Sequence, residues 1–334
     1  MTYLRPKDHV DGGAFVMLRI AIVCAALACA AASAFAATYT RTWVSGKGVD
    51  STECGPIASP CRTLQRAYFN TNAGGEVNIL DGAGYGSLDI TKAISIVNDG
   101  AGVAGVLASA GSPGINISTG LDDSVVLRGL TIEGAGVGSN GIRFTNGGSL
   151  TISNVNIQGF TPTNGDGSSG NGIYLRPGSG QPRISISNAN ISDNGNAGIL
   201  FRPNNDGGGR VAIDRLITTN NKYGLSADAT NAATTTFPIV TNSVATNNSF
   251  AGFHFEGGAV YNAFVRTFGQ LASSQAGGNL TGLIVNGNTK MVLSGCTIAG
   301  NLSVQVSGTG QIQSIGNNSV FGSASLTPTP LTPY

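Results

Sequence analysis

Six side chains that could carry chemistry stand at fixed offsets behind glycines. They are Tyr174, Arg176, Arg202, Asp228, His254 and Glu256. Each follows, by two or four residues, a glycine that opens a short segment of alternating apolar and polar residues. Neighbouring side chains of an extended strand point to opposite faces, so these two offsets share the outward face. The pattern therefore predicts one surface that displays all six.

The first three of these side chains suit carbohydrate binding. An aromatic ring such as that of Tyr174 can lie against a sugar. Arg176 and Arg202 can bind uronate carboxylates through two parallel hydrogen bonds. We expect Tyr174, Arg176 and Arg202 to form one substrate-binding patch.

The other three side chains suit acid–base catalysis, and we expect them to form a second patch beside the first. Asp228 and Glu256 near His254 could act as acid and base, and carboxyl groups about 5–5.5 Å apart would suit a retaining glycosidase. Polar residues must also face solvent in any case, so the same positions fit a solvated sheet face with an Arg202–Asp228 ion pair. The sequence leaves these alternatives open.

The elements that position these residues belong to a repeat. The glycine-led segments begin at Gly141, Gly172, Gly198, Gly224, Gly252 and Gly282. A second series of apolar positions lies between them, at Leu127, Ile152, Ile186, Ile213, Val240, Val265 and Leu293. Both series recur every 25–34 residues or so, and such a period is typical of a solenoid whose repeats bury their apolar faces by stacking. We predict an all-β fold, a right-handed parallel β-helix of about eight coils that each advance by about 4.8 Å.

Composition agrees with this fold. The chain has 334 residues, of which 50 are glycines, 41% are hydrophobic and only 10% are charged. Glycine and asparagine supply the tight turns that a coil with several corners needs. Regular apolar positions exclude a disordered chain of similar composition.

The N-terminus has the pattern of a signal peptide. Arg19 precedes an apolar run over residues 20–32, and Ala34 and Ala36 are the small residues that a signal peptidase reads. The run is shorter than the roughly 20 residues of a membrane span. We expect residues 1–36 to be removed, leaving no membrane span, and the protein to be secreted, periplasmic or on the cell surface.

Removal of residues 1–36 takes away three of 18 basic and two of 17 acidic residues, so the remaining chain is neutral. A neutral chain argues against nucleic acid as a partner, because phosphate binding needs a basic excess. We also expect no cofactor and no metal.

Three cysteines remain after that cleavage. Cys54 and Cys61 flank a short loop, and in an exported protein they are expected to form a disulfide. The alternative, a metal-binding pair, lacks further ligands nearby. Cys296 stands in a predicted strand, where it is expected to be a buried apolar residue.

Four segments divide the chain. The signal peptide (1–36) is followed by an opening strand from Tyr39 and a short capping helix over 63–69 within residues 37–70, which cover the open end of the solenoid. The β-helix spans 71–322, and residues 323–334 form an extended, mobile tail rich in Pro and Thr. Within the β-helix, Asn154, Asn188 and Asn242 occupy equivalent turns and suggest a ladder of side-chain amides that Arg215 interrupts.

Two stretches carry a resemblance to a known family. The run Ile184-Ser-Ile-Ser-Asn-Ala-Asn-Ile191, with Asn194 and Gly198-Ile199 after it, resembles the parallel β-helix repeat of pectin-lyase-like proteins. Ile152–Ile157 repeats the pattern, and Trp43–Gly46 followed by Pro60–Leu64 is similar to the capping segment of exported members.

The resemblance covers roughly residues 40–320 and implies the fold more than a function, because the family includes lyases, hydrolases, epimerases, adhesins and members without known activity. The chain lacks the acidic cluster of the calcium-dependent lyases. The expected function is therefore polysaccharide binding through the outward face, and the alternative is a polysaccharide lyase or glycoside hydrolase that acts on an acidic glycan.

Overall fold

The computed structural model describes residues 1–3, 38–258 and 267–330. The predicted signal peptide, with Cys24 and Cys29, lies outside the described residues, as do Val265 and the last four residues. Residues from Thr38 onward form one compact unit.

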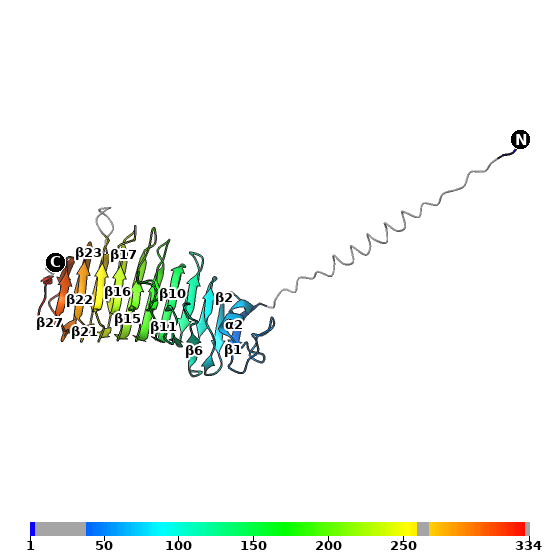
Figure 1. The fold of residues 1–334 in the computed structure, drawn as a ribbon, viewed down its shortest axis with the longest axis horizontal. Coiled ribbons are helices and arrows are strands. Elements are labelled where there is room, and N and C mark those ends of the chain that lie inside the picture. Colours follow the sequence, from blue (N-terminus) through cyan, green and yellow to red (C-terminus); the bar gives the residue numbers. More distant parts are fainter. Residues whose placement is uncertain (4–37, 259–266, 331–334) are drawn as a thin grey trace. The chain divides into compact units, whose positions relative to one another are not determined.

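The described residues of this unit form two parallel sheets and one short helix (Figure 1). The nine-stranded sheet contains β4 (Leu88–Ile90), β7 (Ile115–Ser118), β10 (Asn140–Asn146), β12 (Asn171–Leu175), β14 (Ala197–Phe201), β16 (Tyr223–Asp228), β19 (Ala251–Glu256), β22 (Thr281–Asn286) and β25 (Val304–Gly308). The nineteen-stranded sheet contains β1 (Tyr39–Val44), β2 (Thr71–Ile79), β3 (Ala83–Gly84), β5 (Ile94–Val97), β6 (Ala104–Leu107), β8 (Ser124–Arg128), β9 (Leu130–Glu133), β11 (Ser149–Gln158), β13 (Arg183–Ser192), β15 (Gly209–Thr219), β17 (Thr236–Thr241), β18 (Val244–Thr246), β20 (Thr267–Ala272), β21 (Gln275–Gly277), β23 (Thr289–Ser294), β24 (Thr297–Ala299), β26 (Gln311–Ser314), β27 (Ser319–Phe321) and β28 (Thr329–Pro330).

Each strand pairs in parallel with the equivalent strand of the next coil, which is the pattern of a parallel β-helix and confirms the predicted fold. All six glycine-led segments are strands of the nine-stranded sheet, which continues from β10 through β12, β14, β16 and β19 to β22. The nine strands of this sheet agree with the expected number of about eight coils.

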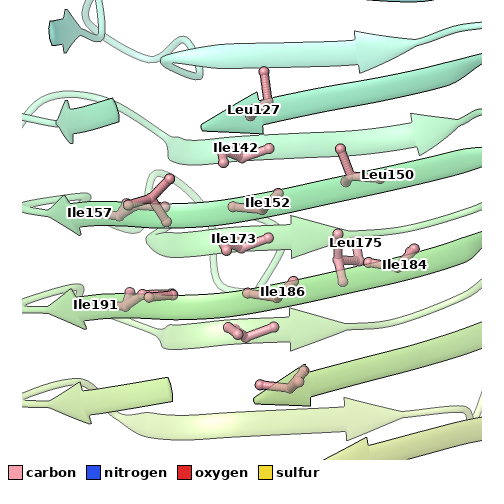
Figure 2. Packing of buried hydrophobic residues seen from close by; sticks show 14 of the residues in the cluster. Leu127, Ile142, Leu150, Ile152, Ile157, Ile173, Leu175, Ile184, Ile186 and Ile191 are labelled. Atoms are coloured by element: carbon pink, nitrogen blue, oxygen red, sulfur yellow. The ribbon is translucent and has the colours of Figure 1, made fainter. Parts of the chain in front are cut away.

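Inward side chains of successive coils stack into continuous apolar columns (Figure 2). One column is in register from Leu127 through Ile152, Ile186, Ile213 and Val240 to Leu271 and Leu293. Leu271 pairs with both Val240 and Leu293 and holds the place to which the sequence assigned Val265, which lies outside the described residues. Full burial of each such side chain contributes about 1.5–3 kcal/mol.

The glycines that open the strands are required by close approach between coils. A Cβ at Gly172 would lie 2.7 Å from the carbonyl oxygen of Gly198, and one at Gly198 would lie 2.6 Å from that of Gly224. Such distances are too short for any side chain, so the glycine repeat is a packing requirement and marks where each coil turns into the nine-stranded sheet.

A buried ladder of amide side chains stabilises one turn of the coil. Each member bonds to the next, in the order Asn194, Asn221, Asn248, Asn279, Asn301 and Gln305. Their side chains also satisfy backbone groups of the turn, as where Asn221 Nδ2 donates to the carbonyl oxygens of Ile191 and Thr219. Buried turns need such partners for their backbone groups.

The predicted amide ladder at the other turn is exposed and short. Asn154, Asn188, Arg215 and Asn242 all adopt left-handed conformations, with φ of 50–54°. Asn188 donates to Asn154, and Arg215 donates to Asn188, whereas Asn242 bonds to Asp214 instead. The ladder is thus broken beside Arg215, as the sequence indicated.

The N-terminal end is covered by the helix α2 (Leu64–Asn70), drawn in blue in Figure 1. Thr63 Oγ1 caps it by accepting a hydrogen bond from the Arg66 amide, and its buried side includes Leu64, Ala67 and Tyr68, which confirms the predicted capping helix. A disulfide joins Cys54 and Cys61 in front of it, as expected. Cys296 is buried, as predicted, and burial raises its pKa.

At the other end, Thr329–Pro330 pairs with β26. This part of the predicted mobile tail therefore continues the nineteen-stranded sheet. Within the described residues, no helix is long and apolar enough to cross a membrane.

The buried ladder yields a test of stability. Asn221→Ala removes the acceptor of the Asn194 amide and a partner of Asn248, so we expect the free energy of unfolding to fall by about 2–3 kcal/mol, measured by urea titration. The control is Asn156→Ala, at an exposed position of β11, which should change it by less than about 0.5 kcal/mol. Equal effects of the two substitutions would contradict the structural role of the buried ladder.

Candidate functional site

Strand register places four of the six predicted side chains on one face, and the other two, Arg176 and Arg202, directly follow β12 and β14. Arg143, Tyr174, Leu200, Ser226, His254 and Ile284 form one column of the nine-stranded sheet. Asp228, Glu256 and Asn286 form a parallel column two residues further along their strands. The alternation in the sequence thus gave the correct face and neighbours for these residues.

Tyr174 is placed differently from the expectation of a stacking platform. Only 2% of its surface is accessible, because it packs against Ala197 and Leu200 on the outside of the sheet. Burial also raises the pKa of its hydroxyl group. In this conformation the ring forms a floor and offers no free face to a sugar.

A hollow of about 460 Å³ lies over this floor, and we call it the arginine hollow. Arg143, Arg176 and Arg202 line it together with Asp166. Among the described residues, the guanidinium groups of Arg143 and Arg176 have no hydrogen-bond or ion-pair partner. Two unpaired guanidinium groups and one that is ion-paired therefore line the arginine hollow.

The loop between β11 and β12, residues 159–170, forms a wall of the arginine hollow. Asn140 Nδ2 donates to the carbonyl oxygen of Ser168, and Asn196 Nδ2 donates to that of Gly167. Arg202 Nη1 donates to the carbonyl oxygen of Asp166 at 2.6 Å. These bonds hold the loop against the sheet, and hydrogen bonds from Ser168 lower the pKa of the Asp166 carboxyl group.

A second hollow of about 270 Å³ adjoins the first, and we call it the carboxylate hollow. Asp228, His254 and Glu256 line it with Leu200, Tyr223 and Ser226. Arg202 lines both hollows and pairs with Asp228 at 2.9 Å, which is the ion pair that the sequence allowed. Asp228 also accepts hydrogen bonds from the Thr230 amide and hydroxyl groups, so this carboxylate is held in place.

His254 is held from three sides. Its Nδ1 lies 2.9 Å from Ser226 Oγ, and its Nε2 lies 3.3 Å from Glu256 Oε2. The ring stacks on Tyr223, with 5.4 Å between centroids. Glu256 Oε2 accepts a further hydrogen bond from Asn286 at 3.1 Å. The hydrogen bond from His254, followed in importance by that from Asn286, lowers the pKa of Glu256 against the opposing effect of burial.

Sequence reasoning did not include Arg143, Tyr223 and Ser226 in the site. Arg143 and Ser226 stand two residues after repeat glycines, so the same offset rule would have found them. Tyr223 precedes its glycine and the loop over 159–170 lies outside the repeat, so no periodic signal marked either of them.

One group of potential metal ligands occurs among the described residues, and it consists of Asp50, Cys54 and Cys61. The two cysteines are joined in the disulfide, and Asp50 accepts hydrogen bonds from the backbone and hydroxyl group of Thr63. This group therefore serves the cap and does not fit a metal.

The hydrogen bonds of Glu256 predict how its carboxyl group titrates. Its carboxyl carbon, followed by NMR, should titrate below the ordinary value of 4.5, and the midpoint should rise in His254→Ala and less in Asn286→Ala. Because the folded pKa is lowered, Glu256 stabilises the fold above its ordinary pKa, and this contribution disappears as the pH falls through the lowered value. A midpoint at or above 4.5 in the unsubstituted protein would contradict the geometry.

The family described as "Right handed beta helix region" matches residues 113–279, half of the chain. No curated protein matches. Among solved structures, the chain is similar to the pectate lyase Pel9A, with 15% identity, a TM-score of 0.54, and coverage of 89% of this chain and 80% of that one.

A pectin methylesterase, PemA from Erwinia chrysanthemi, is 14% identical with a TM-score of 0.48, and the match covers 89% of this chain and 94% of that one. At such identities the likeness concerns the fold alone. The stacked parallel coils and the match to the family agree, and the chain belongs to the right-handed β-helix family.

Proposed function

We propose that this protein binds an acidic polysaccharide along the outer face of its nine-stranded sheet, outside the cytoplasm. The observation that carries the proposal is the convergence of Arg143, Arg176 and Arg202 on one hollow, with two of the three guanidinium groups unpaired among the described residues. Guanidinium groups bind carboxylates in a bidentate manner, so a uronate-containing chain supplies the matching charge.

The shape of the site supports a chain-like ligand. The two hollows adjoin at Arg202 and follow successive coils, so they extend along the stack of strands. Equivalent residues of successive coils are about 4.8 Å apart, which lets several sugar units contact several coils. The charge of the chain as a whole is nearly balanced, which argues against a nucleic acid ligand.

The disulfide supports a location outside the cytoplasm. Disulfides persist in oxidising compartments and are rare in the cytosol. Cys54–Cys61 together with the predicted signal peptide therefore favours an exported protein, either secreted, periplasmic or on the cell surface.

Cleavage of the glycan by a lyase or glycoside hydrolase, with Asp228, His254 and Glu256 as catalytic residues, is less well supported. A hydrolase pair needs one carboxylic acid that stays protonated to donate to the leaving oxygen. The lowered pKa of Glu256 keeps it ionised, and Asp228 is paired with Arg202. The geometry therefore favours binding over glycosidic cleavage.

The binding proposal is tested by calorimetry with an oligogalacturonate. We expect Arg176→Ala and Arg143→Ala each to weaken binding about 5–20-fold, since each removes one charge-assisted contact. Binding should also weaken as salt rises.

The matched control is Arg183→Ala, which removes an exposed arginine from the opposite sheet and should leave the affinity unchanged. A carboxyl-reduced oligosaccharide of the same length should bind at least tenfold more weakly. Equal binding of the charged and the reduced oligosaccharide, or release of shorter oligosaccharides that Glu256→Gln abolishes, would overturn the proposal.

A further inference from the structure

The carboxylate hollow contains a continuous line of hydrogen bonds that glycan binding does not require. It joins Ser226 on β16 to His254 and Glu256 on β19, and ends at Asn286 on β22. Adjacent coils supply these side chains in register. Stacking on Tyr223 fixes the plane of the imidazole ring.

The Glu256 carboxylate determines which atoms of this line donate hydrogen bonds and which accept them. An ionised carboxylate only accepts hydrogen bonds, so Glu256 requires the proton of His254 on Nε2. The Nδ1 atom then carries a lone pair, and Ser226 Oγ–H donates to it at 2.9 Å. In this arrangement the serine donates its proton to an imidazole, and a carboxylate orients that imidazole. Such an arrangement is typical of an activated nucleophile. The two ring nitrogens exchange their usual roles, but the path of the proton is the same.

The surroundings of Ser226 suit a small reacting group. The residue is only 4% exposed, yet it lines the carboxylate hollow, with Leu200 and Tyr223 beside it. Arg202 lines the same hollow and is a donor that can stabilise negative charge on an oxygen. A compact acyl or alkoxy group fits about 270 Å³, whereas the chain that carries it would extend into the arginine hollow.

We propose that Ser226 is the nucleophile of an esterase site that acts on carboxylic esters carried by the bound glycan, with His254 as general base and acid and Glu256 as its positioning residue. The shared chemistry is an ester carbonyl, either of an O-acetyl sugar or of a uronate methyl ester. This inference rests on the proposed function for the substrate, whereas the reactivity of Ser226 is independent of it.

The reaction balances with water as the only co-reactant. His254 Nδ1 takes the proton of Ser226 as Oγ bonds to the ester carbon, and the carbon–alkoxy bond then breaks while His254 gives that proton to the leaving alcohol. Water, deprotonated by His254, attacks the acyl-serine, the Oγ–acyl bond breaks, and Oγ regains a proton. The products are one carboxylic acid and one alcohol.

The direct test is covalent labelling of the mature protein with a fluorophosphonate, followed by peptide mass spectrometry. We expect the label on Ser226, and we expect at least a hundredfold lower labelling rate in His254→Gln and none at this position in Ser226→Ala. Ser307→Ala is the matched control, since Ser307 stands in the same outward column three coils beyond Ser226 and two coils beyond His254. It should label like the unsubstituted protein.

Assays with two substrates distinguish between the two possible esters. Acetate release from an O-acetylated polyuronate and methanol release from a methyl-esterified one are measured in parallel, and at least one should depend on Ser226. Glu256→Gln should lower kcat at least tenfold without raising KM, because it loosens His254 and leaves the arginines in place.

Two results would overturn the inference. One is a folded protein, judged by circular dichroism, in which Ser226 takes no label. The other is ester hydrolysis, or labelling elsewhere, that Ser226→Ala leaves unchanged. If the label appears on Ser226 but the oligogalacturonate does not bind, the nucleophile stands and the glycan proposal fails, so the two failures are distinguishable.

Discussion

The parallel register between coils is the constraint on which the rest of the structure depends. Each strand is fixed by hydrogen bonds to the coil before it and by the inward apolar columns, so a slip of one residue would turn the core outward. Equivalent residues of successive coils must therefore lie directly beside one another. The glycine column and the buried asparagine ladder keep this register, the first by allowing coils to approach and the second by satisfying the turn.

The candidate site is a consequence of that register. A side chain on one coil acquires its partner from the next, as Arg202 does from Asp228 and Ser226 does from His254. No local loop is needed to assemble these pairs, because rigid strands hold them. The loop over residues 159–170 then converts a flat sheet face into a walled groove.

Sequence reasoning predicted the periodic part of this protein well and the rest incompletely. The period-two alternation determines which residues face outward, so the positions of Arg176, Asp228 and Glu256 followed from it. Burial of Tyr174 did not, because the alternation gives the direction of a side chain and not how closely its outward neighbours, such as Leu200, cover it. The sequence assigned Val265 to the inner column because it fits the repeat interval, whereas Leu271, which strand pairing places there, lies closer to Leu293 than that interval allows.

The most direct test of whether the outer face of the nine-stranded sheet is a ligand groove is a crystal structure of the protein with a bound acidic oligosaccharide. We expect sugar units along the two hollows, with carboxylates against Arg143 or Arg176 and the chain passing Arg202 toward His254. An oligosaccharide bound on the nineteen-stranded sheet, or bound here with its carboxylates directed away from the arginines, would contradict this expectation.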